Sequence, residues 1–176
     1  MKNLPISFLG WMMVTFILSA CHHGDESPAI NPLIGEWRAL DDQFLTIRVN
    51  GDEKSLSAFG MEVLRTNEEV ATQAAMEYLQ HNFLGPIDIA EPKLMFLYSG
   101  ELNAVVTGQA IEGIWQFIND RTVLALSSAD LDDNSYLFNV KKLTLSDMVL
   151  DWNWEMTYLG ENAKPFHVLM EIKLVK

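Results

Sequence analysis

The sequence predicts a mostly β domain: an antiparallel meander that closes into a β-barrel, with one or two helices inserted after the first strands. From Lys93 to the end of the chain, apolar and polar residues alternate with a period of two, in short segments that turn residues separate. Residues 67–84 instead follow a helical period. An antiparallel sheet with one face in water gives this alternation, and short strands between turns favour a meander.

The first strand is expected at residues 33–40, close to the start of the globular part near Asn31. Residues 43–49 read as its continuation or its partner. Asn50-Gly51 then predicts a tight turn, because both residues tolerate a positive φ.

A helix is predicted from about Asn67 to Leu84. Thr66 to Glu69 match a capping box, with the Thr66 hydroxyl at the N-cap and a carboxylate three residues later. Gly85-Pro86 should end this helix. Residues 55–64 predict a second, short helix before it. The apolar stripe of the longer helix consists of Val70, Ala71, Ala74, Ala75, Tyr78, Leu79 and Phe83.

The strands expected after Lys93 each have one apolar face. Turns are predicted at Ser99-Gly100, at Gly108 and at Asn119-Asp120, and residues 129–134 form an acidic loop. The apolar faces are, in chain order, Leu94, Phe96 and Tyr98; Leu102, Ala104 and Val106; Ile111, Gly113, Trp115 and Phe117; residues 122–126; Tyr136, Phe138 and Val140; Met148, Leu150, Trp152, Trp154 and Met156; and Phe166, Val168, Met170, Ile172 and Leu174.

Residues 1–20 have the composition of a secretion signal. Lys2 is their single charged residue, and the apolar run from Phe8 to Leu18 is too short for a spanning helix, which needs roughly 20 apolar residues. Leu18-Ser19-Ala20-Cys21 resembles the lipobox of bacterial lipoproteins. The resemblance implies that Cys21 becomes the acylated N-terminus. The alternative, an ordinary cleaved signal, leaves an unpaired thiol in an oxidising compartment.

Residues 21–30 are polar and acidic and read as a flexible tether, so the domain should span 31–176. Asp25 and Glu26 loosely resemble the surface-export signal of Bacteroidota-type lipoproteins. These resemblances imply a lipid-anchored protein of the bacterial cell envelope, on either face of the outer membrane.

The charge of the chain excludes one class of partner. Without Lys2, 11 basic residues face 24 acidic residues, a formal charge of −13. Repulsion from phosphate makes a nucleic-acid partner improbable, and it also disfavours adsorption to anionic lipid. The membrane is therefore expected as a partner through the acyl chains at Cys21, and no protein partner can be assigned.

Gly35-Glu36-Trp37, the helix at 67–84 and the segment from Lys93 to Leu126 together resemble the lipocalin and fatty-acid-binding superfamily. The closer similarity is to the lipocalin-like domains of bacterial lipoproteins. This resemblance implies a barrel that holds a small apolar or amphipathic ligand. The aromatic residues expected to line it are Trp37, Trp115, Phe117, Trp152 and Trp154. The same side chains could instead fill the barrel as core, and Trp37 is expected in the core.

No catalytic motif stands out. Neither His81 nor His167 has a recognisable nucleophile nearby, and P-loop, dinucleotide and metalloprotease motifs are absent from the sequence. His22-His23, and the acidic loop of Asp130, Asp132, Asp133 and Asn134, lack the spacing of metal sites. We therefore expect a non-catalytic protein without metal or cofactor. It either binds a ligand in the barrel or, with a filled barrel, acts through its acidic surface as an interaction or structural module of the envelope.

Overall fold

The structure is a computed structural model that describes residues 31–41, 43–131, 135–157 and 165–176. Asn31–Lys176 form one compact unit. The expected signal, Cys21 and the tether lie outside the described residues, as do Asp132 to Asn134.

The described residues form ten strands and four helical segments. The strands are β1 (Gly35–Arg38), β2 (Leu45–Val49), β3 (Asp52–Lys54), β4 (Lys93–Phe96), β5 (Glu101–Val106), β6 (Gln109–Ile118), β7 (Val123–Ser127), β8 (Ser135–Leu143), β9 (Asp147–Met156) and β10 (Phe166–Val175). The helical segments are the α-helices α1 (Leu56–Glu62) and α2 (Glu68–Leu79), the π-helix η1 (Gln80–Leu84) and the 3₁₀-helix η2 (Ala129–Leu131).

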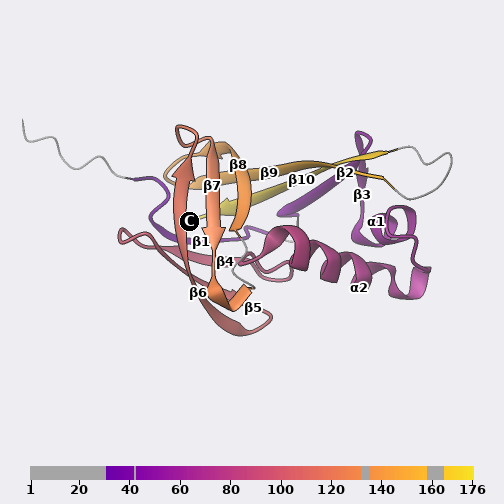
Figure 1. The fold of residues 1–176 in the computed structure, drawn as a ribbon, viewed down its shortest axis with the longest axis horizontal. Helices are drawn as coiled ribbons and strands as arrows, with labels where there is room; N and C mark the ends of the chain where they lie inside the picture. Colours follow the sequence, from indigo (N-terminus) through magenta and orange to yellow (C-terminus); the bar gives the residue numbers. More distant parts are fainter. Residues whose placement is uncertain (1–30, 42, 132–134, 158–164) are drawn as a thin grey trace, which may run out of the picture. The chain divides into compact units, whose positions relative to one another are not determined.

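Eight antiparallel strands close into a barrel, which confirms the predicted fold class. The order around the barrel is β1, then β4 to β10 in sequence (Figure 1). The pairing of Arg38 with Val175 joins β10 back to β1. The β2–β3 hairpin extends the sheet beyond this ring, because β2 pairs with the earlier part of β10, from Val168 to Ile172. Strands β4 to β10 therefore form the predicted meander.

The alternation in the sequence produces the barrel interior. In β5, for example, Leu102, Ala104 and Val106 are buried, whereas the residues between them are exposed. Successive side chains of a strand point to opposite faces, so a period of two assigns one face to the core. The largest fully buried side chains are Trp37, Phe59, Phe96, Phe138, Leu33, Leu79, Leu84, Ile87, Leu94, Leu102, Leu124 and Leu126.

The first strands differ from the expectation. The first strand is limited to Gly35–Arg38, and residues 43–49 are neither its continuation nor its partner. β1 pairs with β4 instead, and β2 pairs with β10 and, across the Asn50-Gly51 turn, with β3. Tyr98 lies after the end of β4 and is largely exposed, so it does not share the buried face of Leu94 and Phe96.

The helices also correct the expectation in two places. Asn67, not Thr66, is the N-cap of α2, because the Asn67 side chain accepts a hydrogen bond from the backbone N–H of Val70. The Thr66 hydroxyl donates to the carbonyl oxygen of Gly60 instead. The α-helix ends at Leu79, and residues 80–84 continue as a π-helix.

Helices α1 and α2 pack against each other and against the sheet (Figure 1). Gly60 of α1 lies directly on the backbone of Ala71 of α2, so the two helices approach more closely than any side chain at position 60 would allow. Aromatic side chains fill the space between these helices and β9. Tyr78 contacts both Phe59 and Phe83, and its hydroxyl lies 3.7 Å from the sulfur of Met156.

Candidate functional site: a cleft between η1 and strands β8 and β9

The barrel interior is filled by its own side chains. Trp37 is fully buried, its indole N–H donates to the carbonyl oxygen of Leu33 at 2.7 Å, and the Lys176 ammonium lies 4.9 Å from the ring centroid. Trp37, expected both as a barrel-lining and as a core residue, is therefore a packed core residue.

Trp115 and Phe117 lie together on the inner face of β6, where both are partly buried. The Trp115 ring contacts Phe96 and Phe117 edge-on, with centroids 6.1 and 5.9 Å apart, and its indole N–H donates to the carbonyl oxygen of Leu97. Edge-to-face pairs with a satisfied indole are typical of structural packing. These two residues contribute to the core near the β4–β5 turn.

Trp152 and Trp154 lie apart from that group and contact Phe83 of η1. Trp154 stacks on Phe83 with centroids 4.1 Å apart, and Trp152 meets Phe83 edge-on at 6.5 Å and Phe138 at 3.8 Å. The Trp154 indole nitrogen is buried without a hydrogen-bond partner among the described residues. The five aromatic residues singled out in the sequence thus separate into a filled interior and a cluster at η1.

A cleft of about 510 Å³ opens beside this cluster. Its lining combines aromatic and aliphatic groups with a few polar groups: His81, Asn82, Phe83, Ser135, Tyr136, Leu137 and Trp152. Three of these residues come from η1, three from the start of β8 and one from β9. The cleft therefore lies where the helical segment meets the barrel wall.

The π-helix positions its side of the cleft. Gln80 fixes the exit from η1, because its amide nitrogen donates to the carbonyl oxygens of Gly85 and Ile87 and its amide oxygen accepts from the N–H of Ile89. Gly85 follows at φ +53°, and its backbone N–H donates to Gln80. A Cβ at position 85 would collide with the Tyr136 ring, so only glycine allows this close approach.

A second cleft, of about 370 Å³, shares His81 and Tyr136 with the first. It is lined by Glu77, Gln80, His81, Gly85, Val106, Asp130, Leu131 and Tyr136. The Tyr136 hydroxyl points to the carbonyl oxygen of His81 at 3.4 Å. The two clefts therefore flank the same contact between η1 and β8.

This arrangement suits non-covalent binding. The cleft beside Phe83 and Trp152 is within the volume range of ligand sites, roughly 300 to 1,000 Å³, and polar and apolar groups line it in similar measure. Among the described residues, no group of three or more His, Cys, Asp or Glu side chains could hold a metal ion.

Sequence reasoning found Trp152 but not its partners in the cleft. Phe83 was assigned to the apolar stripe of an α-helix, and His81 had no assigned role. π-helical turns are rare and often occur at functional sites, but the sequence of residues 80–84 carries no pattern that separates one from an α-helix.

No protein-family model, curated protein or solved structure matches this chain. Within the described ranges, no helix has the length and apolar character needed to cross a membrane.

Proposed function

We propose that this chain is a non-catalytic lipoprotein of the bacterial cell envelope, anchored through Cys21, that binds a small apolar or amphipathic molecule. The cleft between η1 and β8–β9 is the binding site, and the barrel acts as its rigid support. The observation that carries this proposal is the contrast between a filled barrel interior and an open cleft of about 510 Å³ lined by Phe83, Tyr136 and Trp152.

The composition of the cleft indicates the class of ligand. Phe83 and Trp152 offer an apolar surface, while His81, Asn82 and Ser135 supply hydrogen-bonding groups at the cleft. A ligand with an apolar body and a neutral polar group can contact the apolar surface and also form hydrogen bonds with these polar groups. The acidic chain disfavours an anionic ligand, because like charges repel at this surface.

Titration with the neutral fluorescent amine N-phenyl-1-naphthylamine tests the binding site. Leu137 lines the cleft but is about half exposed, so Leu137→Glu places a charge there without disturbing the core. The matched control is Val70→Glu, which changes an equally exposed residue on α2. Saturable binding that Leu137→Glu weakens by about tenfold or more, and Val70→Glu leaves unchanged, supports the cleft. Equal binding by all three proteins contradicts it.

Metabolic labelling with an alkyne palmitate tests the anchor. The processed protein should carry the label and float with membranes, and Cys21→Ser should lose both properties. Unchanged labelling in Cys21→Ser would show that Cys21 is not the acylated residue.

The second candidate function is an envelope interaction module that acts through its acidic surface. Residues 52–91, which include α1 and α2, carry eight acidic and two basic residues, and the filled barrel removes the usual interior ligand site. Cross-linking on intact cells separates the two functions, because this one requires a reproducible protein partner.

A further inference from the structure

The β8–β9 turn lies beside the point where the described chain begins. The backbone N–H of Lys176 donates to the carbonyl oxygen of Ser146, and the Lys176 ammonium donates to that of Pro32 at 2.7 Å. Residues 31–35, Lys176 and the turn are thus held together on one side of the barrel.

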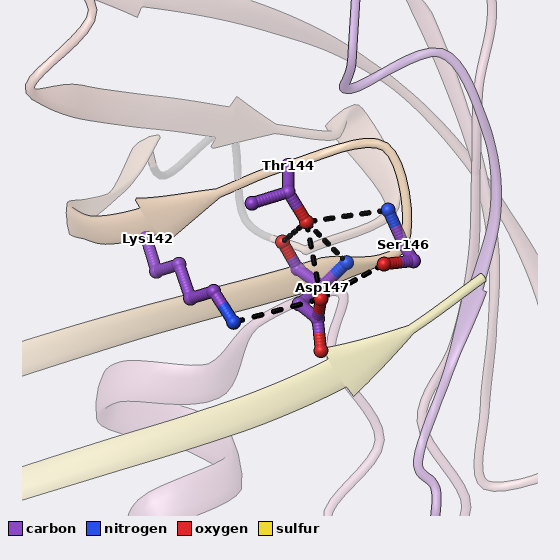
Figure 2. Close-up of polar contacts among 4 residues, drawn as sticks. All are labelled: Lys142, Thr144, Ser146 and Asp147. Carbon is purple, nitrogen blue, oxygen red and sulfur yellow. Dashed lines mark hydrogen bonds and ion pairs between the residues drawn. The ribbon is translucent and has the colours of Figure 1, made fainter.

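The turn is rigid. The Thr144 hydroxyl accepts from the backbone N–H groups of Ser146 and Asp147, and the Asp147 carboxylate accepts from the hydroxyls of both Thr144 and Ser146 (Figure 2). The Lys142 ammonium lies 3.5 Å from the same carboxylate (Figure 2). The hydrogen bonds from Ser146 and Thr144 also lower the pKa of Asp147. Leu145, at the centre of this ordered turn, is 59% exposed.

Next to the turn lies a cleft of about 360 Å³ that is lined by both apolar and charged residues. Leu40, which is 74% exposed, lines it together with Phe44 and Met148, and Lys142 and Lys173 also line it. Leu40, Leu145 and this cleft form what we call the tether face. Leu40 and Leu145 are two of the eight large apolar side chains that the described residues expose to solvent.

The charge of the chain is distributed unevenly between this face and the helices. The tether face balances Asp41 and Asp147 with Lys142 and Lys173, whereas residues 52–91 carry eight acidic and two basic residues. An anionic bilayer therefore repels the helical side and tolerates the tether face.

The connection between Cys21 and the described part of the chain is short. Cys21 and Asn31 are ten residues apart, so even a fully extended chain spans at most about 36 Å between them. An anchor at Cys21 thus keeps the start of the described chain within about this distance of the lipid.

We infer that the tether face contacts the bilayer to which Cys21 is anchored, with Leu40 and Leu145 inserted among the lipid headgroups. This orientation turns α1, α2 and the η1 cleft away from the membrane, where a ligand can enter from the aqueous side. The inference rests on the proposed anchor at Cys21 and is independent of ligand binding in the cleft.

Site-specific labelling of the processed full-length protein tests this orientation. Leu145→Cys and Leu40→Cys introduce thiols on the tether face, and Val70→Cys introduces the matched control on α2. Because Cys21 is the chain's single cysteine and its acylated thiol is blocked, each variant takes one fluorophore. The proteins are reconstituted in vesicles of equal parts phosphatidylethanolamine and phosphatidylglycerol that contain a headgroup-quencher lipid.

The labels at positions 145 and 40 should be quenched at least about threefold more than the label at position 70, since interfacial apolar side chains enter roughly 5–10 Å below the surface. Equal quenching at all three positions, or stronger quenching at position 70, overturns the inference. The parent protein reports on the anchor separately. If the parent protein takes the thiol label and does not float with vesicles, Cys21 is not the anchor, and the proposed orientation is contradicted as well.

Discussion

Replacing Gly85 with alanine should destabilise the protein by breaking the contact between η1 and β8. Gly85 has φ +53°, and an added Cβ would overlap the ring of Tyr136. The ψ of Gly85 is −110°, a combination that residues with a Cβ rarely adopt and that costs them about 1–3 kcal/mol. Overpacking against a ring that core neighbours hold in place costs about 1–3 kcal/mol more. The free energy of unfolding should therefore fall by about 2–6 kcal/mol.

Gly108→Ala is the matched control. Gly108 has φ +79°, but nothing lies within 4 Å of a Cβ at that position. Its replacement should cost only the backbone contribution, about 1–2 kcal/mol. A larger cost at Gly85 than at Gly108 indicates the steric contact with Tyr136, which a Tyr136→Ala background isolates.

Urea unfolding, followed by tryptophan fluorescence, measures both variants. In a Tyr136→Ala background the cost of Gly85→Ala should fall by about 1–3 kcal/mol, which is the coupling energy between the two positions. The reasoning is refuted if Gly85→Ala costs no more than Gly108→Ala in the parent protein, or if removing the Tyr136 ring leaves that cost unchanged.

Three further predictions concern other parts of the fold. Gly60→Ala should cost about 2–4 kcal/mol in thermal unfolding, because a Cβ would meet the backbone of Ala71; a neutral result would mean that the helices separate easily. Asp88→Ala should cost about 2–4 kcal/mol in urea, because the buried Asp88 carboxylate accepts backbone N–H groups of its own loop and of Thr107; Asp88→Asn should cost less. Asp147 has a lowered pKa, so its stabilisation is present above the ordinary carboxyl pKa and is lost as the pH falls through the lowered value. The difference in Tm between the parent and Asp147→Asn should shrink between neutral pH and about pH 3, and a constant difference would contradict this.

The sequence predicted the barrel well because the barrel depends on local patterns. Strands β5 and β10 keep a strict alternation of burial, and the turns predicted at Gly108 and at Asn119-Asp120 adopt positive φ values that Gly, Asn and Asp tolerate. The placement of β2 was wrong because its partner β10 lies more than a hundred residues away. Strand pairing between segments so far apart in the sequence depends on tertiary packing, and no local sequence pattern indicates it.

The candidate site was only partly predictable for a similar reason. Trp152 and Trp154 were singled out from their strand, but their separation from Trp115 depends on the path of η1. The Asn67 and Thr66 side chains were both able to cap α2, and the competing hydrogen bond from Thr66 to Gly60 decided between them. The capping residue and the position of these tryptophans depend on tertiary contacts, which cannot be predicted from the pattern of residue types along the sequence.

Photo-crosslinking with a diazirine-bearing monoacylglycerol, followed by peptide mapping, tests the central claim most directly. The account predicts saturable cross-links to residues 81–83 and 135–137, at the cleft between η1 and β8. Cross-links to interior residues such as Phe96 and Leu126, or the absence of any saturable cross-link, would contradict the claim that this protein binds its ligand outside a filled barrel.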